Sequence, residues 1–267
     1  MIRLAIFLAL GTAPAAFADG GFFTGRDVVF LGEQHDNPAH HRKQAELVGE
    51  IAPQALVFEM LTPEQAARVT PDLIADEDAL EEALGWAESG WPDFAMYYPI
   101  FAAAPEAAYF GAALPRAEAR RVMEAGTEAV FGPEAARFGL DQALPEDQQA
   151  AREALQLSAH CDAMPAEMLP MMVDIQRLRD ARLAQEALAA LESAGAPVVV
   201  ITGNGHARPD WGAPFVLSQA APDVTYATFG QGEATFGTPD GGFDMVDITE
   251  DVERGDPCAA FNAPAGD

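Results

Sequence analysis

Apolar residues along this chain form short runs that predict strands, separated by longer stretches with the periodicity of helices. The most uniform run is 197–202 (PVVVIT), and another, 27–32, leads into a densely polar segment. Further runs predict strands at 56–58 with its flanks, 108–114, 224–229 and 243–248. Because helices alternate with these strands, the pattern predicts an α/β fold with a mostly parallel or mixed central sheet flanked by helices.

The predicted helices cover much of the remaining chain. Apolar spacing predicts one helix over 37–51 and a long one from about 170 to 193. The segments 62–101 and 133–164 are rich in Ala and Glu and contain no convincing strand. We predict that these two segments form one helical cap, folded over the sheet edge, within a single domain spanning 19–267.

The amino terminus has the pattern of a secretory signal peptide. Arg3 precedes an apolar stretch at 4–10, and small residues end the segment, which predicts cleavage after Ala18. The apolar stretch is too short to cross a bilayer, and no later segment is long enough. No cysteine lies near the cleavage site to accept a lipid, so we expect a soluble periplasmic protein.

The chain is strongly acidic. It has 42 Asp and Glu residues against 15 Lys and Arg, and its formal net charge is −27. Such a surface repels nucleic acids and anionic membranes, which excludes both as partners. Its two cysteines, Cys161 and Cys258, both lie in the exported part. An oxidising compartment favours a disulfide between them, and two separate buried thiols are the alternative.

Ionisable residues follow three of the predicted strands. Glu33 and His35 follow the first, Glu59 follows the second, and His206 lies in the segment GNGH after the strand at 197–202. In parallel sheets, ligands bind beyond the carboxyl ends of the strands, so we expect these four side chains to converge on one pocket.

The four residue types suit metal binding and acid–base catalysis. Imidazole and carboxylate ligands favour zinc, iron or manganese, so His35, Glu59 and His206 are the candidate metal ligands. Glu33 could then act as a general base. In the alternative interpretations Glu33 caps the next helix, Glu59 pairs with a surface arginine, and His206 is an ordinary polar loop residue. His40 and His41 are weaker candidates, and we expect one of them to face solvent.

Four motifs resemble a known family. GEQHDNPAHH, ALVFEM, IQRLRDARLAQEA and ITGNGHARPDWGAP, in this order, are similar to segments of the ChaN-like haem-binding proteins. That family shares a superfamily with the Tiki metalloproteases and the erythromycin esterases. The resemblance implies that the two G-x-x-H motifs and one strand-end glutamate form the site, which corresponds here to His35, His206 and Glu59, with Glu33 beside them.

The ChaN branch implies haem binding between paired monomers, with a tyrosine as the iron ligand and a role with the outer-membrane uptake machinery. The candidate ligands are Tyr97 and Tyr98, in the aromatic stretch WPDFAMYYPIF; the alternative places both in an ordinary helical core. No CxxCH is present, which excludes covalent haem attachment. Many relatives are lipoproteins, and this chain lacks the cysteine that would accept the lipid.

The motif at 176–180 adds polar residues to the long predicted helix. Gln176 and Asp180 are four residues apart and share one helix face, with Arg179 at its edge. They could orient the site histidines, or Arg179 and Asp180 could hold neighbouring loops.

These observations predict an exported haem-binding protein that contributes to haem or iron uptake. The alternative is a metal-dependent hydrolase that cleaves an ester or amide at the two-G-x-x-H plus Glu site with a divalent metal ion. A third interpretation is a scaffold whose ancestral site is idle. Haem binding depends wholly on the resemblance, and the residues alone favour the hydrolase, so whether the protein is an enzyme is left open.

Overall fold

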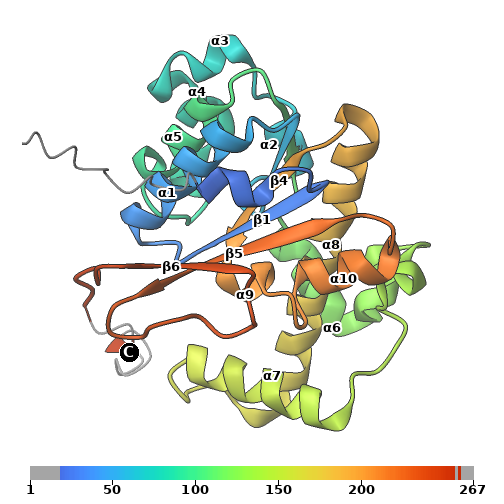
Figure 1. The fold of residues 1–267 in the computed structure, drawn as a ribbon. Coiled ribbons are helices and arrows are strands. Elements are labelled where there is room, and N and C mark those ends of the chain that lie inside the picture. Colours follow the sequence, from blue (N-terminus) through green and yellow to red (C-terminus); the bar gives the residue numbers. More distant parts are fainter. Residues whose placement is uncertain (1–18, 256–257, 260–267) are drawn as a thin grey trace, which may run out of the picture.

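The computed structural model describes residues 19–255 and 258–259, and its centre is a six-stranded sheet (Figure 1). The strands are β1 (Val28–Glu33), β2 (Ala55–Phe58), β3 (Ala108–Gly111), β4 (Val198–Gly203), β5 (Tyr226–Glu233) and β6 (Met245–Thr249). Their order is β3-β2-β4-β1-β5-β6, and every pair of neighbouring strands is parallel. The predicted α/β fold is confirmed.

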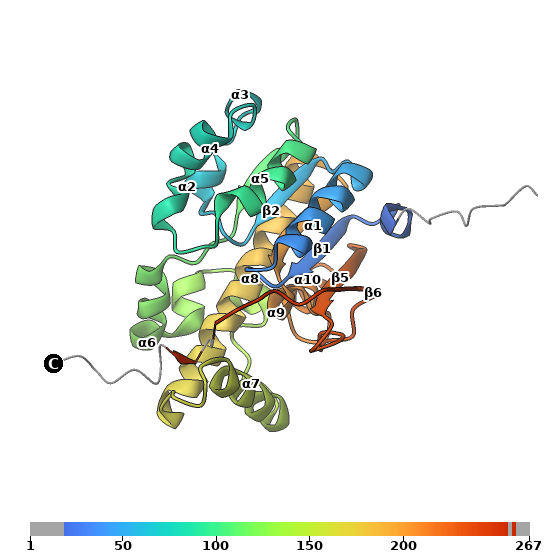
Figure 2. The same cartoon turned by 90° about the vertical axis from the view of Figure 1, so that its left-hand side faces the viewer.

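Helices cover both faces of this sheet, as Figures 1 and 2 show. On one side lie α1 (Pro38–Ile51), α2 (Pro63–Ala66), α3 (Pro71–Ile74), α4 (Glu77–Leu84) and α5 (Phe94–Ala103). On the other side lie α6 (Arg116–Phe131), α7 (Glu146–Ala159), α8 (Leu169–Ala194), α9 (Asn204–Ala207) and α10 (Ala213–Ala220). Short 3-10 helices occupy Asp19–Phe23, Trp86–Glu88, Ala135–Phe138 and Ala166–Met168.

Successive side chains along each strand point to opposite faces of the sheet, so the protein has two hydrophobic cores. Val29 and Leu31 of β1 pack with α1 and α5, whereas Val28 and Phe30 pack with α8 and α10. All six residues of β1 are buried, as expected for a parallel strand covered on both faces. The direction of each residue beyond a strand end therefore follows from its position in this alternation.

The two helical segments predicted to form one cap contribute to different cores. Leu80, Trp86 and Phe94 of segment 62–101 belong to the α1 side of the sheet. Phe138 and Leu140 of segment 133–164 belong to the α8 side. The apolar side chains of the two segments therefore pack on opposite faces of the sheet.

Strand β5 is longer than predicted. The apolar pattern ends at Phe229, but the strand continues to Glu233. Its glycines allow close contacts: a Cβ at Gly230 would lie 2.7 Å from the Phe243 ring, and one at Gly232 would lie 2.0 Å from the carbonyl oxygen of Gly237. Glycine normally weakens a strand, which is why the sequence pattern missed this extension.

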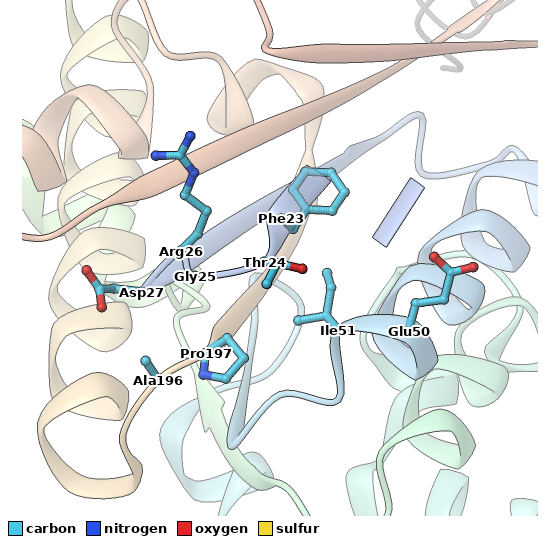
Figure 3. A pocket seen from close by; sticks show the side chains of 9 residues that line it. All are labelled: Phe23, Thr24, Gly25, Arg26, Asp27, Glu50, Ile51, Ala196 and Pro197. Carbon is cyan, nitrogen blue, oxygen red and sulfur yellow. The ribbon is translucent and has the colours of Figure 1, made fainter. Parts of the chain in front are cut away.

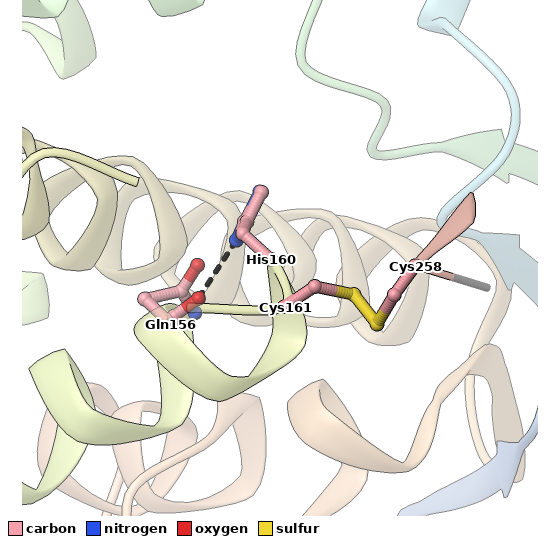
Figure 4. Close-up of a disulfide and its surroundings, with 4 residues drawn as sticks. All are labelled: Gln156, His160, Cys161 and Cys258. Carbon is pink, nitrogen blue, oxygen red and sulfur yellow. Dashed lines mark hydrogen bonds between the residues drawn. A yellow bond between two sulfur atoms is a disulfide. The ribbon is translucent and has the colours of Figure 1, made fainter. Parts of the chain in front are cut away.

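A disulfide joins Cys161, just after α7, to Cys258 near the carboxyl end of the chain (Figure 4). The Cα atoms are 5.5 Å apart and 97 positions separate the two residues, so the predicted bridge is confirmed. The predicted signal peptide lies outside the described residues. None of the helices within 19–255 and 258–259 is both long and apolar enough to cross a membrane.

Candidate functional site

The candidate site lies at the carboxyl ends of β1, β2 and β4. The register pairs Glu33 with Gly203, and Phe58, the residue before Glu59, with Ile201. Glu33 continues the series Val29, Leu31 toward α1 and α5, whereas Glu59 continues the series Val57 toward α8. The sheet thus brings the predicted strand ends together and directs their carboxylates to opposite faces.

Glu33 is a buried carboxylate, 1% exposed, surrounded by hydrogen-bond donors. Its Oε1 lies 2.8 Å from Nδ1 of His35 and accepts a hydrogen bond from the Tyr97 hydroxyl over 2.8 Å. Its Oε2 lies 3.3 Å from Nδ1 of His41. Burial alone would raise the pKa of Glu33, but the hydrogen bonds and charges of His35 and His41 lower this pKa to about 2. Glu33 is therefore ionised at neutral pH.

His35 is the accessible member of the group, with 34% of its side chain exposed. Burial would lower its pKa, but the hydrogen bond to Glu33 and the charges of Glu59 and Glu33 raise the pKa of His35 to about 9. The ring lies close to Gly203, where an added Cβ would be 3.0 Å from Nε2 of His35 and 3.8 Å from Oε2 of Glu59. The missing side chain at Gly203 lets His35 reach across the sheet toward Glu59. The ring of Trp91 packs edge-on against His35, with 4.9 Å between centroids.

Glu59 and His206 form a second pair on the α8 side. Oε2 of Glu59 accepts hydrogen bonds from Thr202 (2.6 Å) and from the backbone N–H of Gly203 (2.9 Å). Its Oε1 lies 3.7 Å from Nε2 of His206. Burial would raise the pKa of Glu59, but the charges of His206 and His35 lower this pKa.

Asp180 holds the other nitrogen of His206. Its Oδ1 lies 2.6 Å from Nδ1 of that ring, and both residues are buried. Burial would lower the pKa of His206, but the charges of Glu59 and Asp180 raise this pKa. Each site histidine is thus held through Nδ1 by one buried carboxylate, an arrangement that fixes the ring orientation.

The motif at 176–180 divides its residues among different roles. Asp180 orients His206, as one of the two interpretations predicted, and Gln176 lines a small cavity beside these two residues. Arg177 ties α8 to a loop by donating to the carbonyl oxygens of Gly139 and Gln142, each over 2.7 Å. Arg179 lines a larger cavity beside Glu59.

His40 and His41 are both fully buried, so the prediction that one faces solvent is wrong. Nδ1 of His40 accepts a hydrogen bond from the backbone N–H of Gln34 over 2.9 Å, and Nε2 of His41 lies 2.8 Å from the carbonyl oxygen of His35. Both rings satisfy backbone groups of the turn between β1 and α1. Polar contacts of this kind make burial of an imidazole tolerable.

The two tyrosines predicted as haem ligands use their hydroxyls inside the protein. Tyr97 is fully buried and donates to Glu33, whereas Tyr98 donates to the carbonyl oxygen of Ile74 over 2.9 Å. Burial, reinforced by the negative charge of Glu33, raises the pKa of Tyr97. Ionisation of this phenol is therefore opposed where an iron–tyrosinate bond would need it.

The site histidines and carboxylates lie close together, but their arrangement is not that of a metal-binding cluster. Within the described ranges there is no group of three or more His, Cys, Asp or Glu residues placed to hold a metal ion. Oε2 of Glu59 is occupied by Thr202 and Gly203, and Nδ1 of His206 is occupied by Asp180. A shared metal at His35, Glu59 and His206 stays a prediction.

Two cavities flank this site. One of about 510 Å³ lies between Glu59, Trp91, Arg179 and the start of α6. Another, of about 590 Å³, lies on the β5 side and is bordered by Gln34, Asn204 and Phe236. A third cavity, of about 400 Å³, lies at the opposite, amino end of the sheet, between 23–27, 50–51 and 196–197 (Figure 3). Ligands of open parallel sheets bind at the carboxyl end, which favours the first two.

An arginine from the carboxyl-terminal segment forms ion pairs at the edge of the site, next to His35. Arg254 donates to Oδ1 of Asp36 over 2.7 Å and to both oxygens of Glu233 over 2.6 Å. Asp36 follows His35 directly, and Glu233 ends β5. The segment after β6 is thereby fastened beside His35 before it reaches the disulfide.

Sequence comparison identifies the family. A family profile described as haem-binding uptake, Tiki superfamily, ChaN, matches residues 23–217. This chain belongs to the ChaN family. The resemblance predicted from the four motifs is confirmed. No curated protein matches the sequence significantly.

One solved structure supports the fold of this ChaN-family chain. The chain is similar to ChaN of Campylobacter jejuni, in a structure that describes cofacial haem binding, with 17% identity, a TM-score of 0.57, and 77% of this chain and 81% of that chain covered. It is more weakly similar to the type III effector HopBA1, with 14% identity, a TM-score of 0.44, and 87% and 92% covered. A succinoglycan biosynthesis protein has 12% identity, a TM-score of 0.38, and 79% and 67% covered.

Proposed function

We propose that this protein binds haem at the carboxyl end of the sheet, where His35 would hold the iron. The match to the haem-binding uptake family over 23–217 is the observation that carries the haem proposal. The choice of His35 comes from the site, where its imidazole is partly exposed while Tyr97 is buried and bonded to Glu33.

The position and orientation of the His35 ring would allow it to hold an iron. Its Nδ1 is held by Glu33 at 2.8 Å, which keeps a proton on that nitrogen and directs Nε2 away from this carboxylate. Because the pKa of His35 is raised to about 9, Nε2 must release its proton before it can bind iron, so haem binding should strengthen as the pH rises toward 9. A carboxylate partner raises the basicity of a ligating imidazole. When bound, haem supplies an iron that accepts a nitrogen ligand. Trp91, beside His35, offers an apolar ring to the porphyrin.

Haem titration of the mature protein tests this proposal. We expect stoichiometric binding by the wild type, and loss of the histidine-ligated absorption spectrum in His35→Gln with the fold intact by circular dichroism. His160→Gln is the matched control, because this histidine lies at the end of α7, where its Nδ1 is 2.8 Å from the carbonyl oxygen of Gln156 (Figure 4). A wild type that takes up no haem would refute the proposed function, and an unchanged His35→Gln spectrum would refute only the choice of ligand.

We further propose that the protein acts after export, in haem or iron uptake in the periplasm, as the amino-terminal sequence and the family suggest. A homodimer around haem and contact with the outer-membrane uptake machinery belong to the same proposal. Sedimentation of the protein with and without haem tests the dimer: haem should shift a monomer to a dimer. The alternative of a metal-dependent hydrolase gains no support from the comparisons.

A further inference from the structure

Arg179 is a basic side chain of α8 in a strongly acidic protein. Its Nε is buried and makes no hydrogen bond to any residue in the described ranges. The neighbouring arginines of α8 are paired: Arg177 with Asp174 and Arg182 with Glu118, each at 3.7 Å. A chain with 42 acidic and 15 basic residues could readily supply a carboxylate for Arg179. A buried guanidinium atom left unpaired is costly, which indicates that something else satisfies it.

Two carboxylates line this cavity, and that of Glu59 is already engaged. Glu59 lines the same cavity of about 510 Å³, but its oxygens face Thr202, Gly203 and His206 instead. The positive charge of Arg179 is close enough to His206 to oppose its protonation. Glu88 also lines the cavity, but among the described residues neither glutamate forms an ion pair with Arg179, so its guanidinium is not engaged by a carboxylate there.

The start of α6 adds to the positive character of this cavity. Arg116 is the first residue of α6 and lines the cavity, and no side chain caps this helix end. A cation at a helix amino terminus is unfavourable for the helix, because the dipole is positive there. An anionic group in the cavity would offset that cost and would accept hydrogen bonds from both arginines.

We propose that the cavity beside Glu59 binds a carboxylate of the ligand through Arg179, with Arg116 at its rim. This inference rests on the proposed haem binding, and the carboxylate is then a propionate of haem. Arginine suits this role because its planar guanidinium can donate two parallel hydrogen bonds to one carboxylate. Trp91, which lines the cavity and packs against His35, connects this anionic subsite with the proposed iron ligand.

The test compares haem with its dimethyl ester, in which both propionates are esterified. We expect wild-type protein, in the same dilute detergent, to bind haem about tenfold more tightly than the ester, because the ester loses a charge-assisted interaction. Arg179→Gln should weaken haem binding by a similar factor and leave ester binding unchanged, which removes the preference. Arg179→Lys keeps the positive charge but not the planar guanidinium that donates two hydrogen bonds. This variant should therefore keep part of the wild-type preference for haem over its ester. Arg182→Gln, one turn further along α8, is the matched control and should behave like the wild type.

The outcomes separate this inference from the proposed function. Equal affinity of the wild type for haem and its ester would overturn the inference while haem binding stands. A preference for haem that persists in Arg179→Gln would also overturn the inference. The comparison of haem with its ester in the wild type uses unaltered protein, so misfolding of a variant cannot affect it. Failure of the wild type to bind either compound would overturn haem binding itself.

Discussion

The hydroxyl of Tyr97 donates a hydrogen bond to Oε1 of Glu33 over 2.8 Å, although 64 positions separate the two residues. Tyr97 comes from α5 and Glu33 from the end of β1, so this contact ties a helix to the candidate site. The same carboxylate holds Nδ1 of His35. We infer that Tyr97 positions His35 through Glu33.

The first prediction is that Tyr97→Phe destabilises the protein without abolishing haem binding. Removing the hydroxyl takes a donor from a buried carboxylate, which should lower the free energy of unfolding by about 1–3 kcal/mol. Urea denaturation measures this loss. Tyr98→Phe, the control, removes a hydrogen bond to a backbone carbonyl and should cost less, about 0.5–1.5 kcal/mol. A folded Tyr97→Phe protein that has lost its haem spectrum would contradict this prediction.

The second prediction concerns the stability of the protein at different pH values. The pKa of Glu33 is lowered to about 2. Its contribution to the stability of the folded state is therefore complete above its ordinary pKa and is lost as the pH falls toward 2. The pKa of His35 is raised to about 9, so its contribution is complete below its ordinary pKa and is lost as the pH rises through 9. The urea midpoint should therefore be highest from about pH 5 to 6.5.

A double comparison checks this assignment. Glu33→Gln should flatten both limbs of the pH profile, because the neutral amide no longer stabilises protonated His35. His35→Gln should flatten the alkaline limb. If both variants keep the alkaline limb of the wild type, the Glu33–His35 pair is not its cause.

The third prediction concerns Asp180 and His206. Asp180→Asn removes the charge that lies 2.6 Å from Nδ1 of His206 and should lower the pKa of that histidine. Imidazole resonances followed by NMR across a pH titration measure the change. Asp174→Asn, on the same helix and paired with Arg177, is the control and should leave His206 unchanged.

The fourth prediction is that reduction of the Cys161–Cys258 disulfide destabilises the protein. Closing a loop of this length restricts the unfolded chain, so opening it should cost up to about 4–5 kcal/mol of unfolding free energy. Thermal melts with and without reductant measure the effect, and the Cys161→Ser, Cys258→Ser double variant should match the reduced protein. Reaction of both thiols with a maleimide in native, unreduced protein would contradict the bridge.

Local sequence patterns were sufficient to predict most of the sheet, and from the sheet the location of the site. Apolar runs such as 197–202 are buried on both faces, so their pattern is visible without a structure. Parallel strands bring their carboxyl ends to one edge, and this rule alone predicted that Glu33, His35, Glu59 and His206 would meet. The family motifs could also be recognised from the sequence, because each is a short continuous segment of the chain.

The contacts of each site residue could not be predicted from these patterns and follow from the packing of the helices on the sheet. Strand alternation directs Glu33 toward α5 and Glu59 toward α8, so Tyr97 became the partner of one and His206 of the other. Burial of His41, and the lack of a hydrogen-bond partner for Nε of Arg179 within the described residues, likewise depend on which helices cover which face. Such contacts join residues far apart in the chain, and the free energy of a buried polar group is set by those neighbours and not by its own sequence context.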